Sequence, residues 1–176
     1  MADTILKQDQ LETFFQSLIS SFLGVTDPSA VRVSWPEDGA PAWEISQDVC
    51  FLKVTYADDP YTRQMVRDYA PGDLSNVTEN LTYTLVILLS LEIYGPNAFD
   101  NSDIIRFNLV SNPTTLLLKQ NNLALITDIP SPIRIPELFN GQWWNRASLS
   151  VKFNEKVVRQ SLVPFLTTPD IQLIEG

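Results

Sequence analysis

Apolar residues recur every three or four positions near the N-terminus and predict an amphipathic helix over residues 9–23. Gly24 follows this stretch, at the position where many helices end in a left-handed cap. One face of the helix is therefore expected to pack against a core. The apolar stripe consists of Leu11, Phe14, Phe15, Leu18, Ile19 and Phe22.

Two shorter helices are predicted in the second half of the chain. The first covers residues 98–110, with Asn97 as its N-cap, and the second covers residues 114–119. Asp100 and Asp103 lie three positions apart on the first of these helices. They either compensate the helix dipole or share a cation. We favour dipole compensation because both residues lie near the N-terminal end of the helix.

β-Strands are predicted where apolar residues alternate with polar ones or form short continuous runs. The strongest signal covers residues 81–95 and is typical of a central strand that is covered on both faces. It ends at Gly95 and Pro96, because proline cannot extend a strand ladder. The other expected strands cover residues 30–35, 49–56, 122–129 and 147–153, with two weaker candidates between residues 157 and 174.

These elements together predict a single α+β domain over residues 1–176. We expect a mostly antiparallel β-sheet or sandwich, flanked by two or three α-helices. Residues 57–80 are polar and contain Pro60, Pro71 and Gly72, so they predict a long flexible arm or loop. The prolines of residues 130–136 predict an extended, stiff connection.

The composition excludes several classes of function. The formal net charge is −9, which disfavours a protein that wraps phosphates. The acidity serves solubility, or it forms a surface that repels DNA so that DNA slides past. The chain contains no histidine, which excludes Ser-His-Asp and Cys-His catalysis and the usual zinc ligands. Cys50 lies between Val49 and Phe51 and is expected to be a buried, inert thiol.

No motif in the sequence predicts a chemical site. The six glycines form no phosphate loop, and no metal-ligand spacing is present. Asp58, Asp59 and Pro60 are typical of a turn rather than of a catalytic pair. We therefore predict no catalytic, cofactor-binding or metal-binding residues. We also expect no secretory signal, and the longest apolar run, residues 85–91, is too short to span a bilayer.

Two adjacent tryptophans stand out in the stretch PELFNGQWWNRASLSVKFNE, residues 136–155. Neighbouring side chains of a strand point to opposite faces. One of Trp143 and Trp144 is therefore expected to enter the core and the other to face outward. The outward tryptophan either contacts a partner, since tryptophan is enriched at interface hot spots, or is covered by residues 57–80.

Two stretches of the chain resemble a known family. YGPNAFDNSDIIR, residues 94–106, and IPELFNGQWWNRASLSVKFNE, residues 135–155, resemble signature stretches of the phage neck or tail terminator proteins. Trp35-Pro36 adds a weaker early match, whereas residues 57–81 contribute nothing to the resemblance. The motif residues that the resemblance marks as a possible interface are Tyr94, Gly95, Pro96, Asn97, Phe99, Asp100, Pro136, Glu137, Leu138, Phe139, Asn140, Gly141, Trp143 and Trp144.

This resemblance implies a structural virion protein and no enzyme. Proteins of the family are expected to form a ring, usually a hexamer, that caps the tail tube, ends its polymerisation and docks the tail to the head connector. The implied partners are other copies of the chain, the tail tube protein and the connector, and DNA passes through the bore without specific binding. The implied location is the tail or neck of the virion, assembled in the host cytoplasm, with no membrane and no cofactor. Within this interpretation, one tryptophan anchors the sheet to a helix, and the surrounding segment shapes an interface.

Three other interpretations remain open. The chain is alternatively another phage head-to-tail joining or baseplate assembly protein, which would share the acidity and the ring symmetry. A carboxylate-only enzyme would require a pocket with convergent acids of perturbed pKa. A nucleic-acid-binding module is disfavoured by the net charge.

Overall fold

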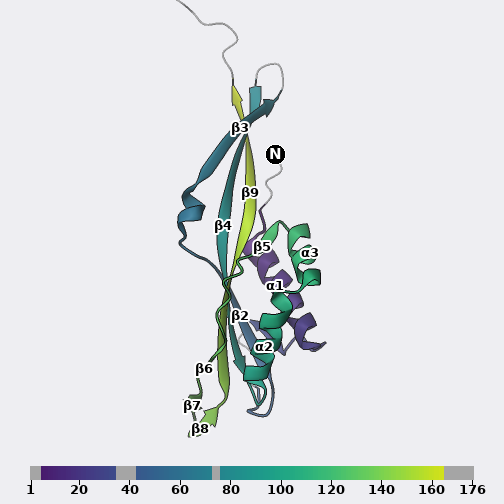
Figure 1. The fold of residues 1–176 in the computed structure, drawn as a ribbon, viewed down its shortest axis with the longest axis vertical. Coiled ribbons are helices and arrows are strands. Elements are labelled where there is room, and N and C mark those ends of the chain that lie inside the picture. The colour runs from purple at the N-terminus through teal and green to yellow at the C-terminus, as the bar shows by residue number, and fades with distance from the viewer. Residues whose placement is uncertain (1–4, 35–42, 73–75, 165–176) are drawn as a thin grey trace, which may run out of the picture.

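The computed structural model describes residues 5–34, 43–72 and 76–164. Within them, helices pack on a mostly antiparallel seven-stranded sheet (Figure 1), which confirms the predicted α+β class. The helices are α1 (Gln8–Leu23), α2 (Ala98–Leu109) and α3 (Asn112–Gln120), with a 3-10 turn, η1 (Pro60–Arg63). The strands of the large sheet are β1 (Val31–Val33), β2 (Val49–Tyr56), β3 (Met65–Pro71), β4 (Asn76–Tyr94), β5 (Leu123–Leu125), β6 (Ile133–Arg134) and β9 (Arg146–Pro164).

The sheet is organised around its two longest strands. The strand order is β1-β2-β4-β9-β5, and β1 pairs with β2 in parallel. β4 and β9 are each 19 residues long and pair antiparallel along their whole length. On its other side, β4 pairs first with β3 and then with β2. β6 pairs with β9, so the stiff segment 130–136 runs along the edge of the sheet.

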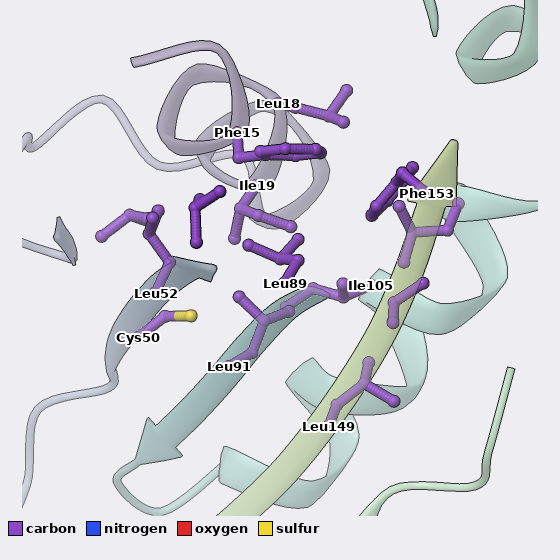
Figure 2. Packing of buried hydrophobic residues seen from close by; sticks show 14 of the residues in the cluster. Phe15, Leu18, Ile19, Cys50, Leu52, Leu89, Leu91, Ile105, Leu149 and Phe153 are labelled. Carbon is purple, nitrogen blue, oxygen red and sulfur yellow. The ribbon is translucent and has the colours of Figure 1, made fainter. Parts of the chain in front are cut away.

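The hydrophobic core lies between the helices and one face of the sheet. Alternate residues of β4 and β9 point toward the helices and are buried, as Leu89, Leu91 and Leu149 show in Figure 2. The rings of Phe15 on α1 and Phe153 on β9 meet at 4.8 Å between their centroids. Cys50 is buried in this core, which confirms the expected buried thiol, and its burial raises the pKa of the thiol to about 12.

β4 is central, as predicted, but helices cover only one of its faces. On the opposite face Val86 is buried, whereas Leu88 and Ser90 are half-buried. The expectation of a strand covered on both faces is therefore wrong over most of its length. The continuous apolar run of residues 85–91 predicted cover on both faces, but leucine is also tolerated at partly exposed strand positions.

The end of α1 confirms the predicted cap. Gly24 adopts a φ of 65°, in the left-handed region, and the next amide, Val25 N–H, donates to the Ser20 carbonyl at 3.1 Å. At the other end of the helix, the Lys7 backbone N–H donates to Gln10 Oε1 at 2.9 Å. These bonds satisfy backbone groups that a helix leaves without partners at its ends.

Residues 57–80 do not form the irregular loop that their polarity predicts. They contain η1, then β3, then the first residues of β4. β3, β4 and β9 extend together beyond the helices (Figure 1). We call this part, made of β3 with residues 77–83 and 157–163, the arm. The weaker strand candidate after residue 157 is not separate either, because β9 continues through it to Pro164.

Some expectations fall on residues outside the described ranges. These are the Trp35-Pro36 pair and the last strand candidate, after Pro164.

Candidate interface at the aromatic end of the sheet

The turn from β4 into α2 requires glycine at position 95. Gly95 has a φ of 118°, and a Cβ there would collide with the Asp48 carboxylate and the Gln47 carbonyl. Asn97 occupies the predicted N-cap position, but its side chain makes no capping bond. Instead its Nδ2 donates to Asp48 Oδ2 at 2.8 Å, and its backbone N–H donates to Asp48 Oδ1 at 2.9 Å. Asp48 therefore holds the turn.

The tryptophan pair lies in a small hairpin and not at the start of β9. The hairpin consists of β7 (Glu137–Phe139) and β8 (Gln142–Trp144), joined by Asn140 and Gly141. Both turn residues have positive φ, 49° and 76°, as a two-residue Asn-Gly turn requires. The predicted alternation holds, since Trp143 is 68% exposed and Trp144 is half-buried, but neither tryptophan enters the core as expected.

Trp144 packs into an aromatic cluster on the face of the sheet that lies away from the helices. Its ring centroid is 5.9 Å from that of Trp43 and 6.1 Å from that of Phe139. Trp43 in turn contacts Phe51 at 5.0 Å and Tyr94 at 5.8 Å. Phe51 and Tyr94 follow Cys50 and Ile93, which point toward the helices, so they point the other way. The hypothesis that a tryptophan anchors the sheet to a helix is therefore wrong.

A network of charged groups ties the hairpin to the sheet. Glu137 accepts from the Tyr94 hydroxyl at 2.8 Å and from Arg146 at 3.0 Å. Arg146 also pairs with Glu92 at 2.9 Å, and Ser148 Oγ donates to Glu92 at 2.8 Å. The bonds from Tyr94 and Arg146 lower the pKa of Glu137, while burial and the adjacent Glu137 raise the pKa of Tyr94. Glu137 is thus held ionised. An ionised carboxylate suits the ion pair and hydrogen bond that tie the hairpin to the sheet, and it does not suit a general acid.

The two resembling stretches meet in space through these contacts. The Tyr94–Glu137 bond joins residues 43 positions apart, and the Gly95 N–H donates to the Asn145 carbonyl at 3.2 Å. A hollow of about 300 Å³ lies beside them, lined by Trp43, Tyr94, Glu137, Phe139 and Trp144. Phe99 and Asp100 lie apart from it, exposed on the first turn of α2.

The outer face of the hairpin exposes apolar side chains. Leu138 and Trp143 are direct cross-strand partners on this face, and both are largely exposed, whereas Phe139 lies on the inner face with Trp144. The described part of residues 57–80 does not cover Trp143, because β3 lies at the opposite end of the molecule from β7 and β8 (Figure 1). An exposed tryptophan beside a leucine is typical of a surface that binds a partner.

Two of the acidic residues weighed in the sequence, Asp58 and Asp59, lie at the start of η1. No group of three or more potential metal ligands occurs among the described residues. Asp58 pairs with Arg63 at 2.9 Å, and Asp59 accepts from the Tyr61 N–H at the start of η1, which confirms a turn. No described helix is long and apolar enough to cross a membrane.

Sequence reasoning missed three residues of this region: Trp43, Asp48 and Glu92. Asp48 and Asn97 are 49 positions apart, and no local pattern links them. Arg146 had a weak signal, since it directly precedes a predicted strand and carries a charge next to the tryptophan pair.

A family model for phage neck terminator proteins matches residues 9–176 of the chain. The matched span includes both resembling stretches, the arm and the helices. No curated protein matches the chain.

Proposed function

The chain belongs to the phage neck terminator protein family, and from that premise we propose that it forms a hexameric ring that caps the tail tube. The family makes it a structural protein of the phage tail and neck. In the proposed role, the ring ends polymerisation of the tube and docks the tail to the head connector. Its partners are then other copies of itself, the tail tube protein and the connector protein, and it assembles in the host cytoplasm.

The arm is the observation that supports a ring most strongly. A cyclic ring needs two different surfaces on each subunit, one of which binds the other on the next subunit. The arm extends beyond the helices, and β3 pairs with β4 on one side while no described strand pairs with its other edge. Met65, Val66 and Tyr69 expose apolar side chains on this strand. An isolated three-stranded extension of this kind is costly to leave in water, and a neighbour would cover it.

The aromatic end supplies a separate surface for a partner of a different kind. Leu138 on β7 and Trp143 on β8 lie at the end of the molecule opposite the arm. We assign this hairpin face to docking against a neighbouring neck or tail protein. The clasp of Glu137, Tyr94 and Arg146 would hold the hairpin rigid, which lowers the entropic cost of binding.

The net charge of −9 supports passage of DNA through the ring. A negative surface repels the phosphate backbone, so DNA would move through the bore without binding. An alternative position in the particle, such as head-to-tail joining or the baseplate, would use the same ring symmetry.

Electron microscopy of lysates tests the proposed role. A phage with an early stop codon in this reading frame should produce overlong tubes, or complete tails that never join filled heads. Restoring the chain from a plasmid should restore normal particles. Tails of normal length attached to heads would refute the role, and heads that leak DNA before tails arrive would move the chain to head completion.

A further inference from the structure

One face of β3 presents three exposed side chains in the order apolar, basic, apolar. Met65, Arg67 and Tyr69 alternate along the strand and therefore share one face of the arm. Tyr69 is 61% exposed, and Met65 and Arg67 are exposed to a similar extent. The ion pair that Arg67 makes with Glu79, at 3.5 Å, is long and leaves the guanidinium largely in water. We call these three residues the arm strip.

A second set on α2 has the order apolar, acidic, apolar. Phe99, Asp103 and Phe107 follow one another at four-residue intervals, so they lie along one stripe of the helix. All three are exposed, and Phe107 is 70% exposed. No ion pair to Asp103 forms within the part of the chain that the structure describes. We call these residues the helix strip.

The two strips match in length and in charge. Four strand residues at about 3.3 Å each separate Met65 from Tyr69 by about 13 Å. Eight helical residues at about 1.5 Å each separate Phe99 from Phe107 by about 12 Å. The charged residue is at the midpoint in both strips, and the two charges are opposite. Because each strip reads the same in both directions, the match holds for parallel and antiparallel contact.

We propose that the arm strip of one copy packs on the helix strip of the next copy. This inference rests on the proposed ring and names the contact that would close it. The strips lie on separate parts of the chain, one on the arm and the other in the helix layer (Figure 1). In the contact, Arg67 meets Asp103 while the aromatic and methionine side chains pack on either side.

Charge favours this head-to-tail contact over a contact between identical surfaces. Two arm strips facing each other would set Arg67 against Arg67, and two helix strips would set Asp103 against Asp103. Like charges that face each other across an interface are unfavourable, whereas the mixed contact brings opposite charges together. A contact between two different surfaces of the same chain repeats around a ring and closes it.

Cysteine cross-linking in assembled phage particles tests the contact. The variant carries Arg67→Cys and Asp103→Cys, and a short bis-maleimide links the two central positions in either direction of packing. Cys50 is the only native cysteine and is buried, so the new thiols alone should react. Blots for the chain should show a ladder that ends at a closed ring. Each single variant should give no cross-linked product.

The matched control moves the strand cysteine by one residue. Asp68→Cys with Asp103→Cys places an exposed thiol on the same strand but on its opposite face, so it should give no ladder. A ladder from the control as strong as that from the test pair would overturn the proposal. Cross-linked dimers from either single variant would also overturn it, because they would show contact between identical surfaces.

Reversing the charges of Arg67 and Asp103 provides a second test that does not depend on cysteine cross-linking. Arg67→Asp or Asp103→Arg alone should lower the yield of particles about tenfold, since each places like charges in contact. The two changes together should restore the yield, and circular dichroism should show that all three variants are folded. Failure of the double variant to recover would refute the contact. Particles that contain the chain but give no ladder would refute this contact alone, whereas absence of the chain from particles would refute the proposed function.

Discussion

Replacing Trp144 by alanine should destabilise the fold, whereas the same change at Trp143 should not. Full burial makes a Trp→Ala substitution cost about 3–5 kcal/mol. Trp144 is half-buried and contacts Trp43 and Phe139, so we expect a loss of about 2 kcal/mol in the free energy of unfolding. Trp143 is 68% exposed, and exposed substitutions usually stay within about 0.5 kcal/mol.

In assembly we expect the reverse, with Trp143→Ala impairing the joining of tails to heads more than Trp144→Ala does. Trp143→Ala removes an exposed aromatic anchor, so joining of tails to heads should fall at least about tenfold while the fold stays intact. Urea denaturation of the purified variants measures the first quantity, and counts of joined particles measure the second. Trp144→Phe serves as a control because it keeps an aromatic ring in the cluster. Equal destabilisation by both alanine variants would refute the assignment of inner and outer tryptophans, and normal joining with Trp143→Ala would remove the hairpin from docking.

Three further changes test the contacts around this region. Gly95→Ala should cost about 2–4 kcal/mol in thermal or urea unfolding, because it combines backbone strain with a collision against residues 47 and 48; unchanged stability would contradict the turn geometry. Glu137→Gln should cost about 1 kcal/mol at neutral pH, since the clasp is partly exposed and solvent screens it. The pKa of Glu137 is lowered in the fold, so its contribution is present above the ordinary carboxyl pKa and is lost as the pH falls toward the lowered value; a difference between variant and wild type that persists in strong acid would contradict this. Glu155 behaves in the opposite way: burial raises its pKa, and Oε1 accepts from the Leu6 N–H at 2.7 Å. Glu155→Gln should therefore stabilise the fold at neutral pH, with a gain that shrinks as the pH falls from the raised pKa of Glu155 to the ordinary carboxyl pKa and is absent below it, and a loss of stability at neutral pH would refute the reasoning.

The elements that border the core could be predicted from local patterns. Residues 49–56 alternate and form β2 over that same range, and the stripe of α1 faces the sheet as expected. In both cases burial on one side leaves a period in the sequence. The class of fold followed from these elements.

The arm could not be predicted because, apart from Val157, none of its side chains is buried. β3 and the outer half of β9 have polar residues on both faces, so their sequences lack the alternation that marks a half-buried strand. Cross-strand pairs hold them instead, such as the bonds from Asn80 to Asp68 and from Gln160 to Asn80, both at 3.0 Å. Such pairs join distant positions and leave no local signal.

The candidate interface was predictable only in part. The Asn140-Gly141 turn and the opposite directions of the two tryptophans follow from local rules. Local rules do not show which tryptophan faces the sheet. That depends on Trp43 and Arg146, which reach the hairpin only through the folded sheet.

Cryo-electron microscopy of the neck of the intact particle tests the central claim most directly. The account predicts a ring of six copies of this chain between the end of the tail tube and the head connector. In that ring, the arm of each copy should lie on α2 of its neighbour, and the hairpin face of Leu138 and Trp143 should contact another protein. A chain located at the baseplate or in the head, or present as isolated copies without a ring, would contradict the account.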